Sequence, residues 1–204
     1  MDRRAFLNSS SAALGAAALV AVAGGTGNAG TLQGHVPFAD LGPYPDPAST
    51  PVPNPPFPKH LTATERAHLR TFDELDFDVF SHQRWDRLDE SHASDIRVHW
   101  PDGHYTDGIE QHIADLKAQF VWAPDTRINS HPLRIAMNEL TAVTGVMQGT
   151  FTRPMPDGKG GYVKPTGKAF SINMATVGIW NAEGVMSEEF LFWDNQNFFQ
   201  QLGL

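Results

Sequence analysis

The chain has 204 residues, of which 41% are hydrophobic, and a formal net charge of −8. This length fits one domain with a substantial core, and the acidic balance argues against nucleic acid and anionic membrane surfaces as partners. Because the sequence contains no cysteine, disulfides, thiol nucleophiles and cysteine-based zinc sites are excluded.

Residues 1–30 have the pattern of an export signal. Arg3 and Arg4 precede an Ala-rich apolar run from 12 to 23, and small residues follow up to Gly30. The paired arginines resemble a twin-arginine signal. The apolar run is shorter than the ~20 residues of a spanning helix, so an uncleaved anchor is the weaker alternative. We expect a periplasmic or secreted protein without stable membrane insertion after signal removal.

A proline-rich segment follows at 31–60, where proline recurs between Pro37 and Pro58. Regular helix does not tolerate this density of proline. We therefore expect an irregular or polyproline-type leader, followed by one folded domain at 61–204.

Helical patterns open this domain. Thr62 and Glu65 form a capping-box pattern, Ser81 is the expected cap of a second short helix, and Asp107 opens a third. Between the second and third helices, residues 96–100 alternate like a strand. The apolar stripes of the first and third helices are Leu69, Phe72, Leu75, Val79 and Phe80, and Ile109, Ile113, Leu116 and Phe120.

Strand patterns fill the rest of the chain. We expect strands at about 126–137, 140–153, 168–180 and 185–193, joined by glycine-containing turns. Helices followed by an antiparallel meander indicate an α+β domain with helices packed on one face of the sheet.

Asp194 stands between the last strand and a short C-terminal helix. Sheet alternation puts Asp194, Phe192, Phe190, Glu188 and Met186 on one face. This pattern predicts an apolar pocket with a carboxylate at one end, and such a carboxylate can act as general acid or base. The alternative is an N-cap, because Asp before a helix accepts bonds from its free N–H groups.

Eight local stretches, taken in order, carry a family resemblance over roughly residues 62–204. They are His99-Trp100-Pro101-Asp102-Gly103, Asp107-Gly108, Ala123–Ile128, Thr141–Gly145, Gly149–Thr152, Pro165–Lys168, Phe192–Asn195 and Gln201–Leu204. Together they resemble the SnoaL-like polyketide cyclase or "ester cyclase" family of the nuclear transport factor 2-like superfamily.

The resemblance implies an α+β cone. A curved, mostly antiparallel sheet is wrapped by N-terminal helices and followed by a short C-terminal helix, with an apolar cavity on the concave side. It implies no cofactor and an acidic residue at the end of the last strand as acid/base, a position that Asp194 occupies. It also implies a homodimer formed through the convex face of the sheet.

The candidate catalytic residues are Asp194 and its possible partner His99. The alternative for His99 is an imidazole bonded to a backbone carbonyl. The candidate substrate-binding residues are Trp122, His131, Met147, Asn173, Phe190, Phe192 and Trp193.

A metal site is a weaker alternative. His99, Asp102, His104 and His131 have ligand types that suit zinc, manganese or iron. However, two histidines five residues apart across a proline turn are not a recurrent ligand spacing. We expect no metal and no other cofactor.

The sequence therefore predicts an exported, cofactor-independent SnoaL-like enzyme that acts on a small apolar or aromatic carbonyl or ester compound. Cyclisation, isomerisation and hydrolysis all stay open, because the same acid/base groups serve each of them. The alternative is a non-catalytic periplasmic domain of the same fold that binds a small ligand or acts as a scaffold.

Overall fold

The structure is a computed structural model that describes residues 53–204. The predicted signal at 1–30 and most of the predicted leader at 31–60 lie outside the described residues. Residues 53–62 contain no helix or strand. No helix within 53–204 has both the length and the apolar character that a membrane span requires.

The first helix, α1 (Ala63–Glu74), begins at the predicted capping box. The Thr62 hydroxyl accepts a hydrogen bond from the Glu65 N–H at 3.2 Å, and the Glu65 carboxylate accepts one from the Thr62 N–H at 2.8 Å. A π-helical turn, η2 (Leu75–Phe80), continues α1 directly. The predicted apolar stripe is confirmed, since all five of its members are buried.

The predicted role of Ser81 as a helix cap is wrong. The next helix, the 3₁₀ helix η3 (Trp85–Glu90), has no side-chain cap. The Ser81 hydroxyl instead donates to the Asp76 carbonyl at 2.6 Å and accepts from the Ile128 N–H at 2.8 Å. Ser81 therefore ties the end of η2 to the edge of the sheet.

The remaining elements form a mixed sheet with helices at its side and end. They are β1 (His92–His99), β2 (Tyr105–Asp107), α2 (Ile109–Trp122), β3 (Arg127–Ile128), β4 (Leu133–Met137), β5 (Leu140–Thr150), β6 (Met155–Pro156), β7 (Tyr162–Val163), β8 (Ala169–Trp180), β9 (Met186–Trp193) and α3 (Asn195–Leu202). The main sheet has the order β2-β1-β9-β8-β5-β3, and β4 also pairs with β5. Only β1 and β9 are parallel neighbours in it. The strands β6 and β7 form a separate hairpin.

The single strand predicted at 126–137 is in fact two strands, β3 and β4, with a break at 129–132. Pro132 lacks the N–H that a sheet ladder needs. The side chain of His131, next to it, is completely buried. The break thus places a polar side chain inside the domain.

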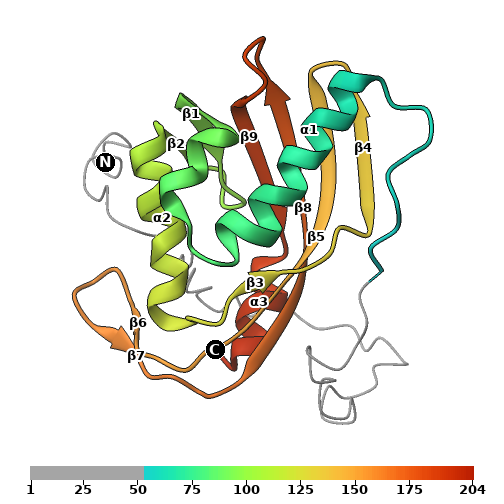
Figure 1. Cartoon of the computed structure of the whole chain (residues 1–204). Helices are drawn as coiled ribbons and strands as arrows, with labels where there is room; N and C mark the ends of the chain where they lie inside the picture. The colour runs from blue at the N-terminus through green and yellow to red at the C-terminus, as the bar shows by residue number, and fades with distance from the viewer. Residues whose placement is uncertain (1–52) are drawn as a thin grey trace, which may run out of the picture.

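The helices cover one face of the curved sheet. Figure 1 shows α1 lying across the sheet, α2 beside it, and α3 at the lower end. The helix α1 contacts β4 and β5, α2 contacts β1, and α3 contacts β8. The predicted α+β architecture, with N-terminal helices, a mostly antiparallel curved sheet and a short C-terminal helix, is confirmed.

The opposite face of the sheet exposes large apolar side chains. Leu133, Ile135 and Met137 of β4, Leu140 of β5 and Phe192 of β9 are each 40–59% exposed.

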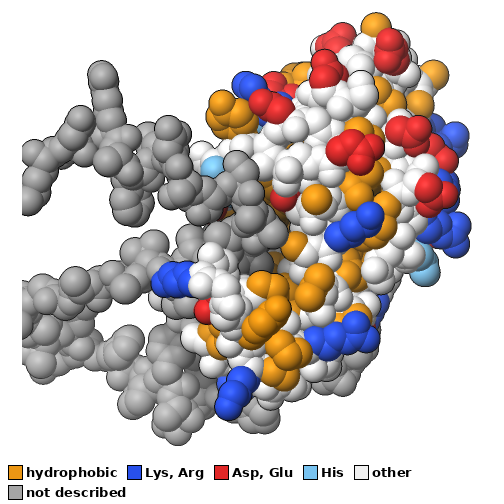
Figure 2. Space-filling view, turned by 90° about the vertical axis from the view of Figure 1, so that its left-hand side faces the viewer, with side chains coloured by type: hydrophobic (Ala, Val, Ile, Leu, Met, Phe, Trp, Pro, Cys, Tyr) orange, Lys and Arg blue, Asp and Glu red, His pale blue; other side chains and the backbone are white. Residues whose placement is uncertain are grey.

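On a neighbouring side of the molecule, which carries α2, hydrophobic side chains gather in the middle and lower part, while acidic ones gather near the top (Figure 2).

Candidate functional site

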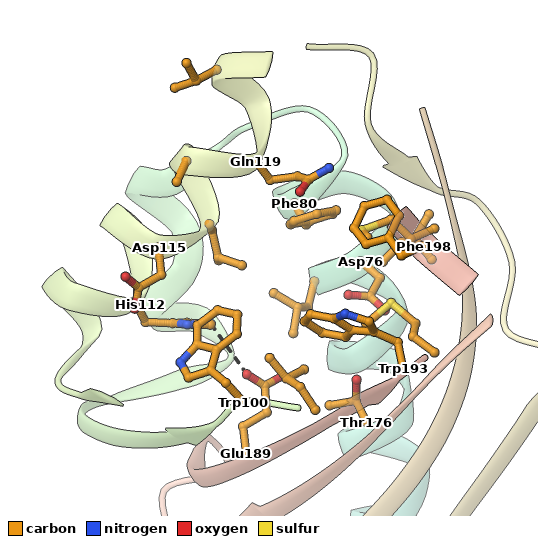
Figure 3. A pocket seen from close by; sticks show the side chains of 18 of the residues that line it. Asp76, Phe80, Trp100, His112, Asp115, Gln119, Thr176, Glu189, Trp193 and Phe198 are labelled. Atoms are coloured by element: carbon orange, nitrogen blue, oxygen red, sulfur yellow. Dashed lines mark ion pairs between the residues drawn. The ribbon is translucent and has the colours of Figure 1, made fainter. Parts of the chain in front are cut away.

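An interior cavity of about 210 Å³ lies between η2, α2 and the helix-covered face of the sheet. Most of its lining is apolar, and no lysine or arginine in the described part of the chain contributes to it. Figure 3 labels most of its polar and aromatic lining residues, namely Asp76, Trp100, His112, Asp115, Gln119, Thr176, Glu189 and Trp193. His92 lines it as well. Two lining residues, Val121 and Pro156, are exposed to solvent and mark where the cavity approaches the surface.

One wall of the cavity carries Asp76, held by a buried histidine. His131 Nε2 lies 2.8 Å from Asp76 Oδ2, and His131 Nδ1 lies 2.7 Å from Asp73 Oδ1. Both ring nitrogens face carboxylates, so both must donate and the ring is an imidazolium. Asp76 Oδ1 has no hydrogen-bond partner among residues 53–204. Figure 3 shows the Asp76 side chain pointing into the cavity.

Arg134 extends this network behind Asp73. Its guanidinium donates to both Asp73 oxygens at 2.7 and 3.0 Å. It also donates to the carbonyls of His131 and Pro55 and to the side-chain oxygen of Asn54. These five bonds match the five N–H donors of arginine. The network therefore fixes His131 and ties residues 54–55 to the domain.

The charges in this network support one another. Burial is the largest effect on His131 and opposes its charged form, but hydrogen bonds and charges from Asp73 and Asp76 outweigh it, so the pKa of His131 is raised. Burial is also the largest effect on Asp73 and favours its neutral form. Bonds from His131 and Arg134 outweigh it and lower the pKa of Asp73.

These two shifts predict a stability maximum in weakly acidic solution. The His131 contribution is complete below its ordinary pKa of 6.5 and is lost as pH rises through the raised value in the folded state. The Asp73 contribution is present above 3.8 and is lost as pH falls through its lowered value. We expect the melting temperature to fall by roughly 2–5 °C between pH 6 and 9 because of His131. Thermal melts of wild type and His131→Gln over this range isolate the effect, and equal slopes would contradict it.

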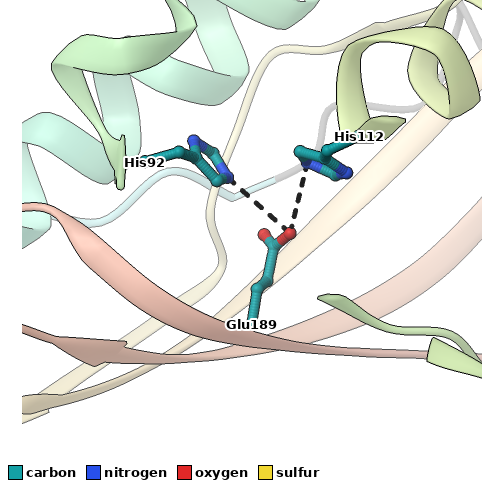
Figure 4. A group of neighbouring side chains, drawn as sticks. All are labelled: His92, His112 and Glu189. Carbon is teal, nitrogen blue, oxygen red and sulfur yellow. Dashed lines mark ion pairs between the residues drawn. The ribbon is translucent and has the colours of Figure 1, made fainter. Parts of the chain in front are cut away.

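A second wall of the cavity carries His92 of β1, His112 of α2 and Glu189 of β9 (Figure 4). The Nε2 atoms of His92 and His112 lie 3.7 and 3.5 Å from Glu189 Oε2. All three side chains are buried. Burial, and secondarily the charge of His92, lower the pKa of His112 well below its ordinary value, so this imidazole is neutral.

Asp115 lies one turn along α2 from His112 and also lines the cavity. Gln111 donates to its Oδ1 at 2.8 Å, while its buried Oδ2 has no partner in the described chain. Burial raises the pKa of this carboxyl, more than the Gln111 and Thr106 side chains lower it.

Asp194 does not lie at this cavity. Its side chain is exposed and caps α3, accepting from the Asn197 N–H at 3.0 Å. The alternation along β9 holds from Glu188 to Asp194, but a register shift breaks it before Glu188, so the prediction for Met186 is wrong and this residue is buried in the core. The cavity is lined by Glu189, Leu191 and Trp193. The face predicted to line the pocket is therefore the opposite one. No observation tests a chemical role for Asp194, which stays a prediction.

His99 also lies on the outer side of the sheet. Its Nε2 bonds Glu188 Oε1 at 2.7 Å, and its ring stacks on Phe190 at 4.1 Å. It has no contact with Asp194 among the described interactions. His104 bonds Asp102 at the surface. In the part of the chain that the structure describes, the four residues of the weaker metal-site alternative, His99, Asp102, His104 and His131, do not come together.

Five of the seven predicted binding residues line one of two places. Trp122, Met147 and Trp193 line the interior cavity. Asn173, Phe192 and Asp194 line a second groove, at the ends of β8 and β9, which Trp193 also reaches. His131 lines neither, although it bonds Asp76. Phe190 packs on His99.

The cavity residues that sequence reasoning missed are Asp76, His92, His112, Asp115 and Glu189. One signal was available: His112, Asp115 and Gln119 recur at helical spacing beside the apolar stripe of α2, which places them on one inward face. Glu189 offered no comparable signal, because acidic Glu188 stands beside it on the opposite face.

The fold has close structural relatives. A candidate SnoaL-like polyketide cyclase from Jannaschia sp. CCS1 superposes with a TM-score of 0.62 at 19% identity, covering 71% of this chain and 97% of that one. IdmH, a candidate polyketide cyclase from Streptomyces antibioticus, superposes with a TM-score of 0.58 at 22% identity, covering 67% of this chain and 99% of that one. TsrD from Streptomyces laurentii superposes with a TM-score of 0.56 at 15% identity, covering 70% of this chain and 97% of that one. The domain therefore has the nuclear transport factor 2-like fold.

The family model for SnoaL-like polyketide cyclases matches residues 71–202, well over half of the chain. The chain belongs to the SnoaL-like polyketide cyclase family, as the local stretches predicted. A search of curated proteins found no match. The family suggests a cyclase-type enzyme that works without a cofactor and binds a small molecule.

Proposed function

We propose that the chain is a cyclase-type enzyme that removes a proton next to the carbonyl group of a small, mainly apolar compound bound in the interior cavity. Asp76 is the general base, and His131 is the positioning residue that orients it. The observation that carries this proposal is the Asp76–His131 pair, 2.8 Å apart, on the wall of an apolar cavity.

The size of the cavity limits the ligand. An apolar cavity of about 150 Å³ holds benzene, so about 210 Å³ fits a single ring with a few substituent atoms. The lining suits such a compound, because it is mainly apolar with a few polar groups. We therefore propose a monocyclic or short-chain ketone or ester as substrate.

The geometry of Asp76 suits proton transfer. One oxygen is fixed by the imidazolium, and the other faces the cavity. This oxygen takes the proton, and the C–H electron pair moves into the carbonyl to form an enolate. The Thr176 hydroxyl, on another wall, is a donor for the enolate oxygen.

The enolate then has two outcomes. Asp76 returns its proton to another carbon, which isomerises the compound, or the enolate carbon attacks a second carbonyl. In that case a carbon–carbon bond closes the ring, and the new alkoxide takes the proton from Asp76. Both routes restore the Asp76 carboxylate, so neither needs an oxidant or reductant.

Proton exchange tests this proposal without a known substrate. We expect the protein to catalyse exchange of the hydrogens next to the carbonyl of monocyclic ketones and esters in D₂O, followed by NMR, with saturation kinetics. Polycyclic ketones, which exceed the cavity, are the control. Compounds that bind, by tryptophan fluorescence, without exchanging would favour the alternative of a non-catalytic ligand-binding domain.

We also propose, from the pattern of residues 1–30, that the chain is exported, and mass measurement of the mature protein tests cleavage there. The exposed apolar side chains of β4, β5 and β9 support a homodimer through the outer face of the sheet. Sedimentation velocity distinguishes this dimer from a monomer.

A further inference from the structure

The cluster of His92, His112 and Glu189 brings three metal-binding side chains together from three separate elements. Their ligand atoms all lie within 4.8 Å of one another, and all three side chains are buried. Figure 4 shows both imidazoles directed at the Glu189 carboxylate. The proposed chemistry of Asp76 does not use this cluster.

The distances within the cluster differ from those of the hydrogen-bonded pairs elsewhere in this molecule. His131 and His99 lie 2.7–2.8 Å from their carboxylate partners, whereas His92 and His112 lie 3.7 and 3.5 Å from Glu189 Oε2. Zinc binds nitrogen and oxygen at about 2.0–2.2 Å, so tetrahedral ligands stand about 3.4 Å apart. The spacing fits ligands around an ion better than it fits direct hydrogen bonds.

The hydrogen bonding of His92 leaves a nitrogen free to bind a metal. The Ser91 hydroxyl donates to the Leu88 carbonyl at 3.1 Å, so it accepts from His92 Nδ1 at 2.8 Å. The other ring nitrogen, Nε2, is buried and has no hydrogen-bond partner within 53–204. It faces Glu189 Oε2 at 3.7 Å. A metal ion between these two atoms would give both of them a partner.

The burial of Glu189 away from any lysine or arginine of residues 53–204 also favours a bound metal ion. Glu189 is only 5% exposed, and the polar partners of its carboxylate in the described chain are the two imidazoles. No lysine or arginine lines the cavity on this part of the chain. Buried charges are costly unless they are paired or coordinate a metal.

We propose that His92, His112 and Glu189 bind one divalent transition-metal ion, of the zinc, manganese or iron(II) class. Two histidines and one carboxylate are the ligand set of many catalytic sites that keep a position open. Here the open position faces the cavity. The Ser91 bond orients His92, as outer-shell partners of metal-binding histidines do. Such a site sets this chain apart from the cofactor-independent chemistry that its family suggests.

The role of the ion, but not its binding, rests on the proposed function. An ion on this wall would polarise the carbonyl oxygen of a compound whose neighbouring hydrogen faces Asp76. Asp76 would still take the proton, so the two walls would act on one compound.

Metal titration of the untagged, EDTA-treated protein tests the site. We expect one Co²⁺ per chain, followed by visible absorption, displacement by Zn²⁺, and a rise in melting temperature that depends on metal concentration. Glu189→Gln and His92→Ala should weaken binding at least about 100-fold, since even outer-shell changes cost 10–100-fold. Their matched controls are Glu188→Gln and His99→Ala, a neighbouring His–carboxylate pair on the outer face, which should bind as wild type does.

Each outcome decides one question. Binding lost in the Glu189 and His92 variants but kept in the controls supports the site, even if no compound undergoes exchange. The absence of exchange would refute only the proposed function. No stoichiometric binding, or equal loss in all four variants, overturns the site, whether or not exchange occurs. Circular dichroism checks that each variant folds, and His112→Gln replaces a Glu189 or His92 variant that does not.

Discussion

Replacing Asp76 by asparagine is expected to slow proton exchange at least about 100-fold, the usual contribution of a general base. The amide keeps the shape of the side chain and can still accept the hydrogen bond from His131, but it cannot take a proton from a carbon. Binding of the compound should change little. Initial exchange rates measured at saturating compound, together with affinities from the fluorescence of the cavity tryptophans, separate the two effects.

Asp194→Asn is the matched control for this change. It also removes one carboxylate, but Asp194 is exposed and caps α3. Asparagine is nearly as good an N-cap, so exchange and stability should both stay close to wild type. If Asp194→Asn abolishes exchange while Asp76→Asn does not, the acid/base role predicted from the sequence is right and the assignment to Asp76 fails.

Local patterns were sufficient to predict most of the longer elements of the fold. The capping box at Thr62 and the apolar spacing behind it depend on residues within a few turns of one another, and α1 follows them. The strands β5, β8 and β9 also lie close to their predicted bounds. The break at 129–132 was not predicted, although Pro132 signalled it, because the partners that draw His131 inward lie on distant elements.

The site was harder to predict because it depends on which face of each element is inside. Both faces of β9 carry aromatic residues, with Phe190 and Phe192 on one and Trp193 on the other, so alternation alone does not say which lines the cavity. On the outer face, Phe190 stacks on His99, which accounts for one of the two aromatic residues there. Which face of β9 lines the cavity depends on the helices that cover the sheet.

The Asp76–His131 pair was also beyond what local sequence patterns can predict. The two residues are 55 positions apart, and no local pattern links them. The sequence marked His131 as a candidate and expected a carboxylate with an imidazole in reach. The carboxylate that meets it comes from the π-helical turn after α1 rather than from the end of β9. Only the packing of η2 against the β3–β4 break brings them together.

Arg134→Met is expected to destabilise the domain by about 3–5 kcal/mol, because it removes one partner from a buried ionic network. Asp73 would keep only His131, and Asn54 and Pro55 would lose their bonds to the guanidinium. For a domain of this size the melting temperature should fall by roughly 10 °C. Thermal melts measure the loss, and limited proteolysis should show faster cleavage near residues 54–55.

Arg97→Met provides the control, because the two arginines bind their partners with the same geometry. Each donates from Nε and Nη2 to the two oxygens of an aspartate at 2.7 and 3.0 Å. Each also lies over an aromatic ring. The Arg97 side chain is 45% exposed and that of Arg134 only 3%. Solvent screening makes exposed pairs weak, so Arg97→Met should shift the melting temperature by no more than about 2 °C. Similar losses in both variants would show that burial does not determine the strength of the network that positions His131 and Asp76.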